Sequence, residues 1–221
     1  MAGAWASGWT LYGYWRSGTS YRTRLALALK GIEVAHAPVD LRAGEQSGEG
    51  FRAKNPQGLV PTLQLEDGTL ISQSPAIIEY VEEVRPDPPL LPEDPVARAR
   101  VRQMAMIVGC DTHPLGNLRV LKALKADHGA DQAAIEAWQA RWNGAAFAAL
   151  EAMLAADPSR GDFAHGDRPG LAECYLLPQL YTARRFAVPL KAYPNLLAVE
   201  AATLALPAVQ RATPEAQPDA D

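Results

Sequence analysis

Cysteine is scarce in this sequence, with Cys110 and Cys174 the only two among 221 residues. Two thiols are too few for a disulfide framework, and one Cys near one His, as in Cys110-Asp111-Thr112-His113, cannot complete the four ligands of a zinc site. We therefore predict no metal centre. The low cysteine content is typical of a protein of the reducing cytoplasm.

Long apolar runs and an excess of positive charge are also missing. No window approaches the roughly 18 consecutive apolar residues of a membrane span, and the N-terminus lacks the pattern of a secretory signal, so we expect neither membrane association nor processing. Lys and Arg number 21 against 25 Asp and Glu, a formal charge of -4. No positive field is left to attract nucleic acid, and neither a dinucleotide-binding glycine fingerprint nor a P-loop occurs.

The composition that is present, 48% apolar and 21% charged residues, is typical of a globular protein with one large domain or two small ones. Residues 85–95 contain five prolines and cannot form a helix or an interior strand. We therefore predict a first domain at residues 1–84, a linker at 85–95 and a second domain at 96–221. The stretch from about residue 207 onward, rich in proline and small or acidic residues, is expected to be disordered.

Strand and helix patterns alternate in the first domain. An aromatic run at 9–14 predicts a strand, and the apolar spacing from Tyr21 predicts a helix that Thr19 or Ser20 caps and Gly31 ends. Residues 33–40 read as an edge strand because they contain Pro38. The domain is therefore expected to be a small α/β layer with one mixed sheet.

The second half of this domain is expected to contain a hairpin and a further helix. Residues 44–50 are rich in glycine and expected to be mobile, followed by a short helix at 51–54. Asp67-Gly68 predicts a tight turn with both residues at positive φ, between strands at 59–65 and 69–72. Ser74 and Pro75 are expected at the N-cap and first position of the next helix.

Beyond the prolines, the sequence is rich in Ala and Leu with helical periodicity at 96–126, 131–156, 171–187 and 195–206. The second domain is therefore expected to be all α.

Several motifs together resemble the zeta class of the glutathione transferase superfamily, whose members include maleylacetoacetate and maleylpyruvate isomerases. The resemblance covers about residues 11–197 and implies a thioredoxin-like domain with a four-stranded mixed sheet, an all-α domain and a homodimer. The motifs are Tyr12-Gly13-Tyr14-Trp15-Arg16-Ser17, Asn55-Pro56-Gln57-Gly58-Leu59-Val60-Pro61, Gln73-Ser74-Pro75-Ala76-Ile77-Ile78-Glu79-Tyr80, Asp111-Thr112-His113-Pro114-Leu115-Gly116-Asn117-Leu118-Arg119 and Ala183-Arg184-Arg185-Phe186.

A glutathione enzyme needs its cosubstrate as the thiolate, because a thiol with a pKa near 8.5 is only slightly ionised at neutral pH. Ser17 precedes a predicted helix, whose N-terminus favours negative charge, so its hydroxyl is the candidate donor to sulfur. The alternative is that Ser17 only caps the helix. The resemblance favours the catalytic role, and Thr19 is a second candidate hydroxyl.

The resemblance also implies the residues that bind glutathione. Val60-Pro61 would be cis and would leave the Val60 backbone to pair with the cysteinyl unit. Gln73 and Ser74 would hold the γ-glutamyl carboxylate, and Gln46 would reach the glycyl end.

Candidate substrate ligands are arginines, since a maleyl diacid carries two carboxylates that guanidinium groups bind in a fork. Arg16, Arg119 and Arg185 are the candidates, and the alternative for the last two is a solvated surface position. The implied reaction is thiolate addition next to a carbonyl, rotation about the resulting single bond and elimination, without a metal.

The sequence departs from the class where many members read Ser-Ser-Cys and this one reads Ser17-Gly18-Thr19. Loss of that cysteine argues against reactions through a protein–glutathione disulfide. A general glutathione transferase or lyase acting on small electrophiles is therefore the alternative to the isomerase. A non-catalytic adaptor with the same fold is a third hypothesis.

Overall fold

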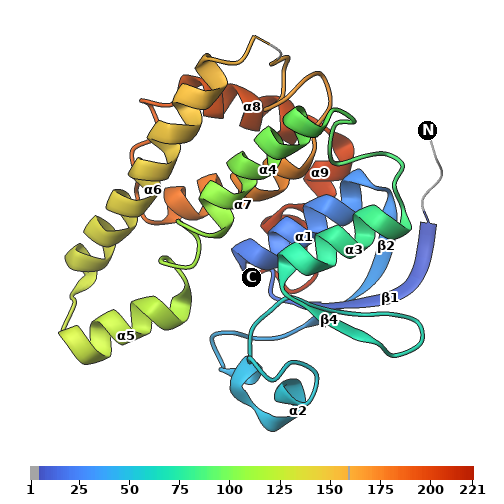
Figure 1. The fold of residues 1–221 in the computed structure, drawn as a ribbon. Coiled ribbons are helices and arrows are strands. Elements are labelled where there is room, and N and C mark those ends of the chain that lie inside the picture. The colour runs from blue at the N-terminus through green and yellow to red at the C-terminus, as the bar shows by residue number, and fades with distance from the viewer. Residues whose placement is uncertain (1–4, 159) are drawn as a thin grey trace. The chain divides into compact units, whose positions relative to one another are not determined.

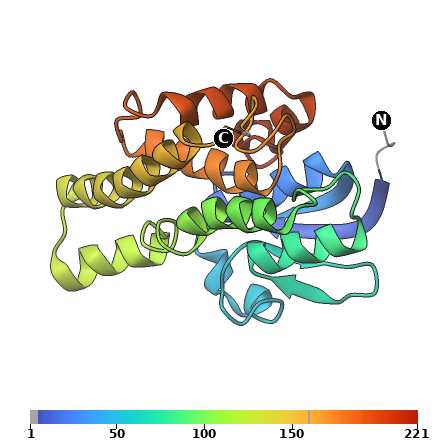
Figure 2. The ribbon, with the colours of Figure 1, turned by 45° about the horizontal axis from the view of Figure 1, so that its top comes forward.

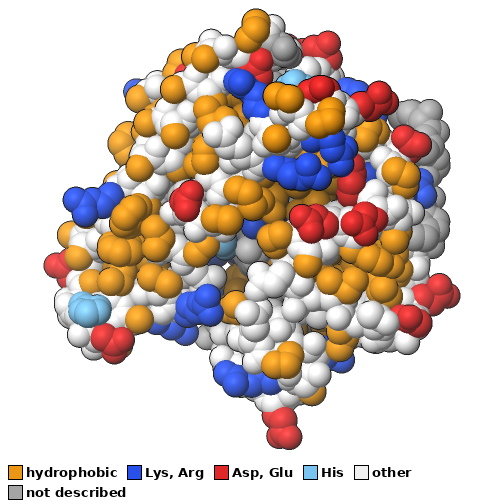
Figure 3. Space-filling view, viewed as in Figure 1, with side chains coloured by type: hydrophobic (Ala, Val, Ile, Leu, Met, Phe, Trp, Pro, Cys, Tyr) orange, Lys and Arg blue, Asp and Glu red, His pale blue; other side chains and the backbone are white. Residues whose placement is uncertain are grey.

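The computed structural model describes residues 5–158 and 160–221, which form two compact units. The first unit extends to Leu90 and includes Ala205–Asp221, and the second comprises Leu91–Leu204. The division falls within the proline-rich segment 85–95, and the residues after Leu204 are part of the first unit. On the face shown in Figure 3, acidic and basic side chains are interspersed.

The first unit is built on a four-stranded mixed sheet, which confirms the predicted thioredoxin-like layer. Strands β1 (Trp5–Gly13), β2 (Ile32–Pro38), β3 (Thr62–Gln64) and β4 (Leu70–Ser72) lie in the order β2-β1-β3-β4. Only β1 and β2 pair in parallel, and β2 is an edge strand, as Pro38 predicts. Helices α1 (Gly18–Leu29) and α3 (Ser74–Val84) pack side by side over the sheet (Figure 1).

The core of this unit lies between the sheet and the two helices. Its members are apolar side chains that alternate along the strands or repeat at helical spacing, which removes them from water on one face of each element. They are Trp9, Leu11, Leu27, Ile32, Leu63, Ile77 and Val81.

The prediction for residues 44–50 was wrong in part, because these residues form a 3-10 helix, η1 (Glu45–Ser47), followed by α2 (Glu49–Arg52). Gly44, at φ 83°, allows the chain to turn into η1. The short helix therefore begins before residue 51.

The hairpin between β3 and β4 forms as predicted, but with a longer turn. Leu65 accepts from the N–H of Gly68 and donates to the carbonyl of Thr69, and only Gly68 has a positive φ. This is a three-residue loop with glycine in the left-handed position, not the two-residue turn expected from Asp67-Gly68.

The predicted helix caps were wrong by one to three residues. Ser17, not Thr19 or Ser20, is the N-cap of α1, because its extended backbone lets its side chain accept from the N–H of Ser20. Gln73 takes the N-cap of α3 with a φ of 70°, so Ser74 and Pro75 lie inside the first turn. The hydroxyl of Ser74 is buried and accepts from Arg22 instead of capping.

The C-terminal stretch, expected to be disordered, is folded. It forms α9 (Pro207–Ala212) and a 3-10 helix, η2 (Pro214–Ala216). Helix α9 packs beside α1 (Figure 2). Its residue Val209 is completely buried. The prolines suggested disorder, but Pro207 and Pro214 begin helices, where the missing N–H costs no hydrogen bond.

The second unit is helical throughout its described regular elements, which confirms the all-α prediction. Its helices are α4 (Pro95–Gly109), α5 (Leu118–His128), α6 (Gln132–Ala155), α7 (Leu171–Arg185) and α8 (Pro194–Leu204). The single helix expected at 96–126 is two helices, since the chain breaks at residues 110–117 around His113-Pro114. Helix α7 contacts α4, α6 and α8 and is buried along most of its length.

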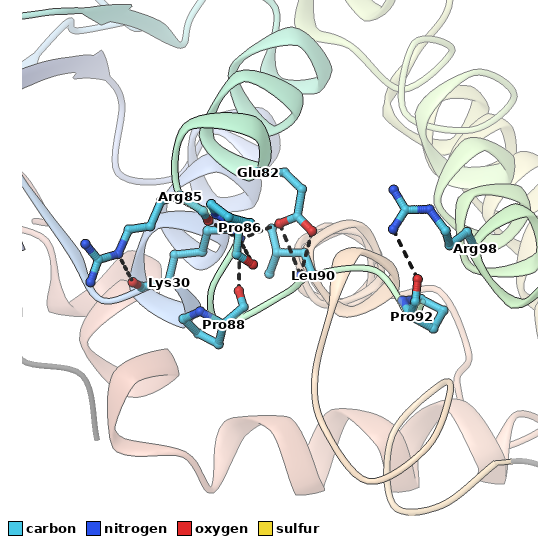
Figure 4. A network of polar contacts seen from close by, with 8 residues as sticks. All are labelled: Lys30, Glu82, Arg85, Pro86, Pro88, Leu90, Pro92 and Arg98. Atoms are coloured by element: carbon cyan, nitrogen blue, oxygen red, sulfur yellow. Dashed lines mark hydrogen bonds and ion pairs between the residues drawn. The ribbon is translucent and has the colours of Figure 1, made fainter. Parts of the chain in front are cut away.

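A buried lysine fastens the segment after α3 to the first unit (Figure 4). Lys30, whose side chain has no exposed surface, pairs with Glu82 and donates to the carbonyls of Arg85, Pro86 and Pro88. Arg85 in turn donates to the carbonyl of Lys30. Because these carbonyls surround the ammonium group, the proline-rich segment is ordered as it leaves α3.

Candidate active site

Ser17 stands where β1 gives way to α1. The turn from Tyr14 to Ser17 is closed by a 3.0 Å hydrogen bond from the Ser17 N–H to the Tyr14 carbonyl. The Ser17 side chain then caps α1, with the Ser20 N–H 3.3 Å from its Oγ. The hydroxyl therefore lies at the N-terminus of a 12-residue helix, where partial positive charge favours an anion.

A chain of hydroxyl groups continues from Ser17. Its Oγ lies 3.1 Å from Oγ1 of Thr19, which donates a 2.9 Å hydrogen bond to the carbonyl of Val60. Thr19 has a single hydroxyl proton, so the proton between the two side chains comes from Ser17. Ser17 is thus a donor with its oxygen fixed and its proton able to turn toward another acceptor.

The segment before Val60 is shaped by Asn55 and Gly58, two residues of the Asn55–Pro61 motif for which no role was predicted. Asn55 is buried, and its amide donates to the carbonyl of Leu59 at 2.6 Å. Gly58 has a φ of 63°, and a Cβ there would lie 2.8 Å from the backbone oxygen of Gln46. The Asn-Pro-x-Gly pattern is the signal that could have identified both. The Val60-Pro61 peptide that follows is cis, as the resemblance implies.

Gln73 and Ser74 form the N-terminus of α3. The Gln73 amide is exposed and donates to the side chain of Gln57 at 2.6 Å. The buried Ser74 hydroxyl accepts from Nη1 of Arg22 at 3.1 Å. The first N–H groups of an α-helix have no intrahelical partner, so this end of α3 is suited to a carboxylate.

Gln46 lies in η1. Its backbone packs against Gly58, and its side-chain Oε1 is buried without a hydrogen-bond partner among the described residues. An unpaired buried amide oxygen costs free energy, so it indicates a site for a donor group that is not part of the chain.

The arginine candidates lie in both units. Arg16 is next to Ser17, and its guanidinium lies 5.0 Å from the centre of the Trp15 ring. Arg119 is exposed in the first turn of α5, and Arg185 is exposed at the end of α7, 5.9 Å from the Phe186 ring. The neighbouring Arg184 forms a bidentate pair with Glu200, which raises the pKa of Arg184.

Within the first unit, direct contacts therefore connect the candidate residues into two groups. Ser17, Thr19 and Val60 form one hydrogen-bonded series, and Gln46 packs against the segment that leads to Val60. Gln73 and Ser74 are adjacent at the end of α3 and are tied to Gln57 and Arg22.

Other kinds of site have no support among the described residues. No group of three or more His, Cys, Asp or Glu side chains there is arranged to hold a metal ion, and neither cysteine forms a disulfide. Within the same ranges, none of the helices combines the length and hydropathy needed to cross a bilayer.

Comparison with sequence families gives two matches. Residues 16–84 match the N-terminal domain of glutathione S-transferases, and residues 132–202 match the C-terminal domain of that family. The chain is also 53% identical over 209 residues to the maleylpyruvate isomerase of a Ralstonia species, covering 95% of this chain and 98% of that protein.

Comparison with solved structures gives relatives with the same names. A holo maleylpyruvate isomerase, described as a bacterial zeta-class glutathione S-transferase, superposes with a TM-score of 0.94 at 51% identity, covering 96% of this chain and all of the other. A maleylacetoacetate isomerase from Methylobacterium extorquens AM1, with bound malonate and glutathione, gives 0.92 at 40% identity, covering 96% and 99%. The zeta class, to which the maleylpyruvate isomerase is assigned, is the class that the sequence motifs resemble.

Proposed function

Because the chain belongs to the glutathione S-transferase family, we propose that it is a glutathione-dependent isomerase that converts the cis double bond of maleylpyruvate or maleylacetoacetate to the trans form. The observation that carries the proposal is the Ser17 hydroxyl, fixed at the N-terminus of α1 with its proton directed along the series to Thr19 and Val60. Similarity to isomerases named for these two diacids supports the choice of substrate.

Ser17 is proposed to hold the sulfur of glutathione as the thiolate, the nucleophile that the addition and elimination steps require. Lowering a thiol pKa by two units from about 8.5 requires roughly 2.7 kcal/mol in favour of the anion. One charge-assisted hydrogen bond and a helix N-terminus together are of this size. Thr19 would keep Ser17 aligned and would not have to contact sulfur itself.

The other parts of glutathione are assigned to the remaining candidate residues of the first unit. The backbone of Val60, before cis Pro61, is proposed to pair with the cysteinyl unit. Gln73 and the N-terminus of α3 at Ser74 would bind the γ-glutamyl carboxylate, and the unpaired Oε1 of Gln46 would accept from the N–H of the glycyl unit. Of these groups, Oε1 of Gln46 is unpaired and the Gln73 amide is exposed, so glutathione would satisfy a buried acceptor at its glycyl unit. The Val60 carbonyl and the Ser74 hydroxyl already accept hydrogen bonds, from Thr19 and Arg22.

The substrate carboxylates are assigned to Arg16, Arg119 and Arg185. Guanidinium groups bind carboxylates through two parallel hydrogen bonds, and a cation near the substrate would also stabilise the enolate that forms during rotation. Malonate bound in the Methylobacterium relative shows that a dicarboxylate is compatible with such a fold.

The direct test is to follow maleylpyruvate by NMR with purified protein, with and without glutathione. The proposal predicts conversion to the trans isomer only when glutathione is present, with glutathione recovered unchanged. A stable conjugate, together with turnover of a neutral halonitrobenzene, would instead support the transferase or lyase. If no heat is released when glutathione is titrated into the protein, the adaptor hypothesis replaces both.

Assembly and location complete the proposal. We infer a homodimer from the resemblance, and a cytoplasmic location from the low cysteine content and the lack of a disulfide between Cys110 and Cys174. Sedimentation at micromolar concentration should give the mass of two chains, and a single-chain mass would contradict the dimer.

A further inference from the structure

The C-terminal segment of the chain contacts the turn that carries Ser17. The N–H of Trp15 donates a 3.0 Å hydrogen bond to Oδ2 of Asp219, across 204 residues of sequence. The carbonyl of Trp15 accepts a 2.8 Å hydrogen bond from Nη2 of Arg24, and Nε of Arg24 donates at 3.0 Å to the carbonyl of Ala212 in α9. Both peptide groups at Trp15 are therefore tied, directly or through Arg24, to the C-terminal segment.

These contacts matter because of where Trp15 lies in the turn. The turn is closed by one hydrogen bond, from the Ser17 N–H to the Tyr14 carbonyl, which leaves the N–H and C=O of Trp15 without a partner inside the turn. Trp15 is only 7% exposed, so water does not readily replace a lost partner. Asp219 and Arg24 thus determine the orientation of the peptide groups that precede Ser17.

The segment that supplies Asp219 is itself well anchored. Val209 and Ala212 are buried beside α1, and the Gln217 side chain donates to the carbonyls of Arg211 and Thr213 at 3.0 and 2.8 Å. The last residue, Asp221, pairs with Arg42, but both side chains are 54% exposed, and such pairs contribute little. Asp219 is the residue of this segment whose side chain bonds to the turn that carries Ser17.

We propose that Asp219 is a positioning residue for Ser17: by holding the N–H of Trp15, the C-terminal segment fixes the hydroxyl in the place where it donates to the glutathione sulfur. The inference rests on the proposed function of Ser17. An acceptor is required at this position, since the Trp15 N–H is buried, whereas a negative charge is not.

The test compares Asp219→Ala, which removes the acceptor, with Asp219→Asn, which keeps an acceptor oxygen without the charge. Each variant is measured for kcat, for KM for glutathione, for thermal unfolding and for thiolate absorbance of bound glutathione against pH. Asp219→Ala should lower kcat about tenfold and raise the pKa of the bound thiol, because small displacements of a reacting group cost up to about 100-fold. Asp219→Asn should recover most of both.

Asp221→Ala is the matched control, because it removes an acidic side chain two residues away and leaves the contact with Trp15 intact. It should behave as the wild type. If Asp219→Ala does not fold, the chain shortened after Gln217 keeps α9 and η2, lacks Asp219, and should show the same loss of kcat and rise in thiol pKa.

The outcomes separate the two proposals. If the wild type binds glutathione as the thiolate and Asp219→Ala has unchanged kcat and thiol pKa, the positioning role is wrong and the proposed function stands. If Asp219→Ala only lowers the unfolding temperature, the residue is structural and the inference fails. If the wild type shows no thiolate at neutral pH, the proposed function fails and the positioning role fails with it.

Discussion

At the scale of single residues, the Ser17 hydroxyl has two roles, as the cap of a helix and as the proposed hydrogen-bond donor to sulfur. Ser17 Oγ accepts from the N–H of Ser20 and so caps α1, while its proton, directed at Thr19 in this structure, can turn toward another acceptor such as the glutathione sulfur. The two roles are compatible because a hydroxyl has one proton and two lone pairs. A side chain that only caps would not need Thr19 and Val60 beside it.

Replacing Ser17 by Ala should therefore have two separable effects. Loss of the donor should lower kcat/KM for maleylpyruvate by about 100-fold, and loss of the cap should reduce the free energy of unfolding by about 1 kcal/mol. Ser17→Thr, which retains a hydroxyl, should keep much of both. Thr19→Val should cost about tenfold or less, since it removes only a neutral hydrogen bond. Steady-state kinetics and urea unfolding measure these effects, and a Ser17→Ala enzyme as active as wild type would contradict the assignment.

Arg119 and Arg185 should affect only charged substrates. Changing either to Met should raise KM for the dicarboxylate by about 10-fold or more, since hydrogen bonds to charged groups contribute about 1.5–3 kcal/mol. Turnover of a neutral halonitrobenzene should be unaffected. Arg102→Met, an exposed arginine on α4, is the control. Equal losses with both substrates would remove the two arginines from substrate binding.

The candidate residues that the sequence could single out are those that stand in a local motif, and their roles stay predictions. Ser17, Val60-Pro61 and Gln73-Ser74 each stand within a few residues of the turn or helix end that defines them. Asp219 and Arg24 could not be predicted, because their contacts with Trp15 and Ala212 depend on the folded C-terminal segment, whose composition indicated disorder.

At the scale of secondary-structure elements, the ends of helices carry much of the polar chemistry. Lys30 follows the last turn of α1 and gathers the carbonyls of the segment after α3 (Figure 4). Sequence patterns predicted the four strands and helices α1 and α3 of the first unit, but not η1, α9 and η2, nor which residue caps each helix. A cap depends on one backbone dihedral angle, as at Gln73, and composition does not specify it.

Lys30→Met should destabilise the protein by about 3 kcal/mol, because removing one member of a buried ion pair leaves the other charge and several carbonyls without a partner. Urea unfolding would measure the loss. Lys122→Met, at an exposed position of α5, is the charge-matched control and should change the free energy of unfolding by less than about 0.5 kcal/mol. Similar small changes for both variants would show that the buried network contributes little.

The start of α7 should give the protein a pH-dependent stability. Burial raises the pKa of Glu173 above its ordinary value of 4.5, although its carboxylate accepts from the N–H groups of Ala164 and Gly170. A raised pKa means that the folded state holds the proton more tightly than the unfolded state. This group's contribution to the unfolding free energy therefore falls as pH rises from about 4.5 through the folded-state pKa.

Glu173→Gln should remove this dependence. Unfolding by urea between pH 4 and 8 should show the wild type losing stability relative to the variant as pH rises. Parallel pH profiles for the two proteins would mean that Glu173 does not change its protonation on unfolding.

At the scale of the whole molecule, the chain consists of a thioredoxin-like unit and a helical unit, with the C-terminal residues returned to the first. The sequence patterns on the two sides of residue 84 predicted a mixed α/β unit and an all-α unit, and the resemblance implied that the first is thioredoxin-like. It could not reveal that the segment after Leu204 packs with residues near the N-terminus, because Val209 and Ala212 are too few to form a pattern and gain their burial from α1.

The proposed isomerase reaction requires glutathione to be held as an anion at Ser17, and the most direct measurement is an ultraviolet difference titration of the wild-type complex from pH 5 to 10. We predict a thiolate band already present at pH 7, with an apparent pKa at least one unit below the value near 8.5 of a free thiol. A band that rises only as it does for glutathione alone in solution would contradict the account.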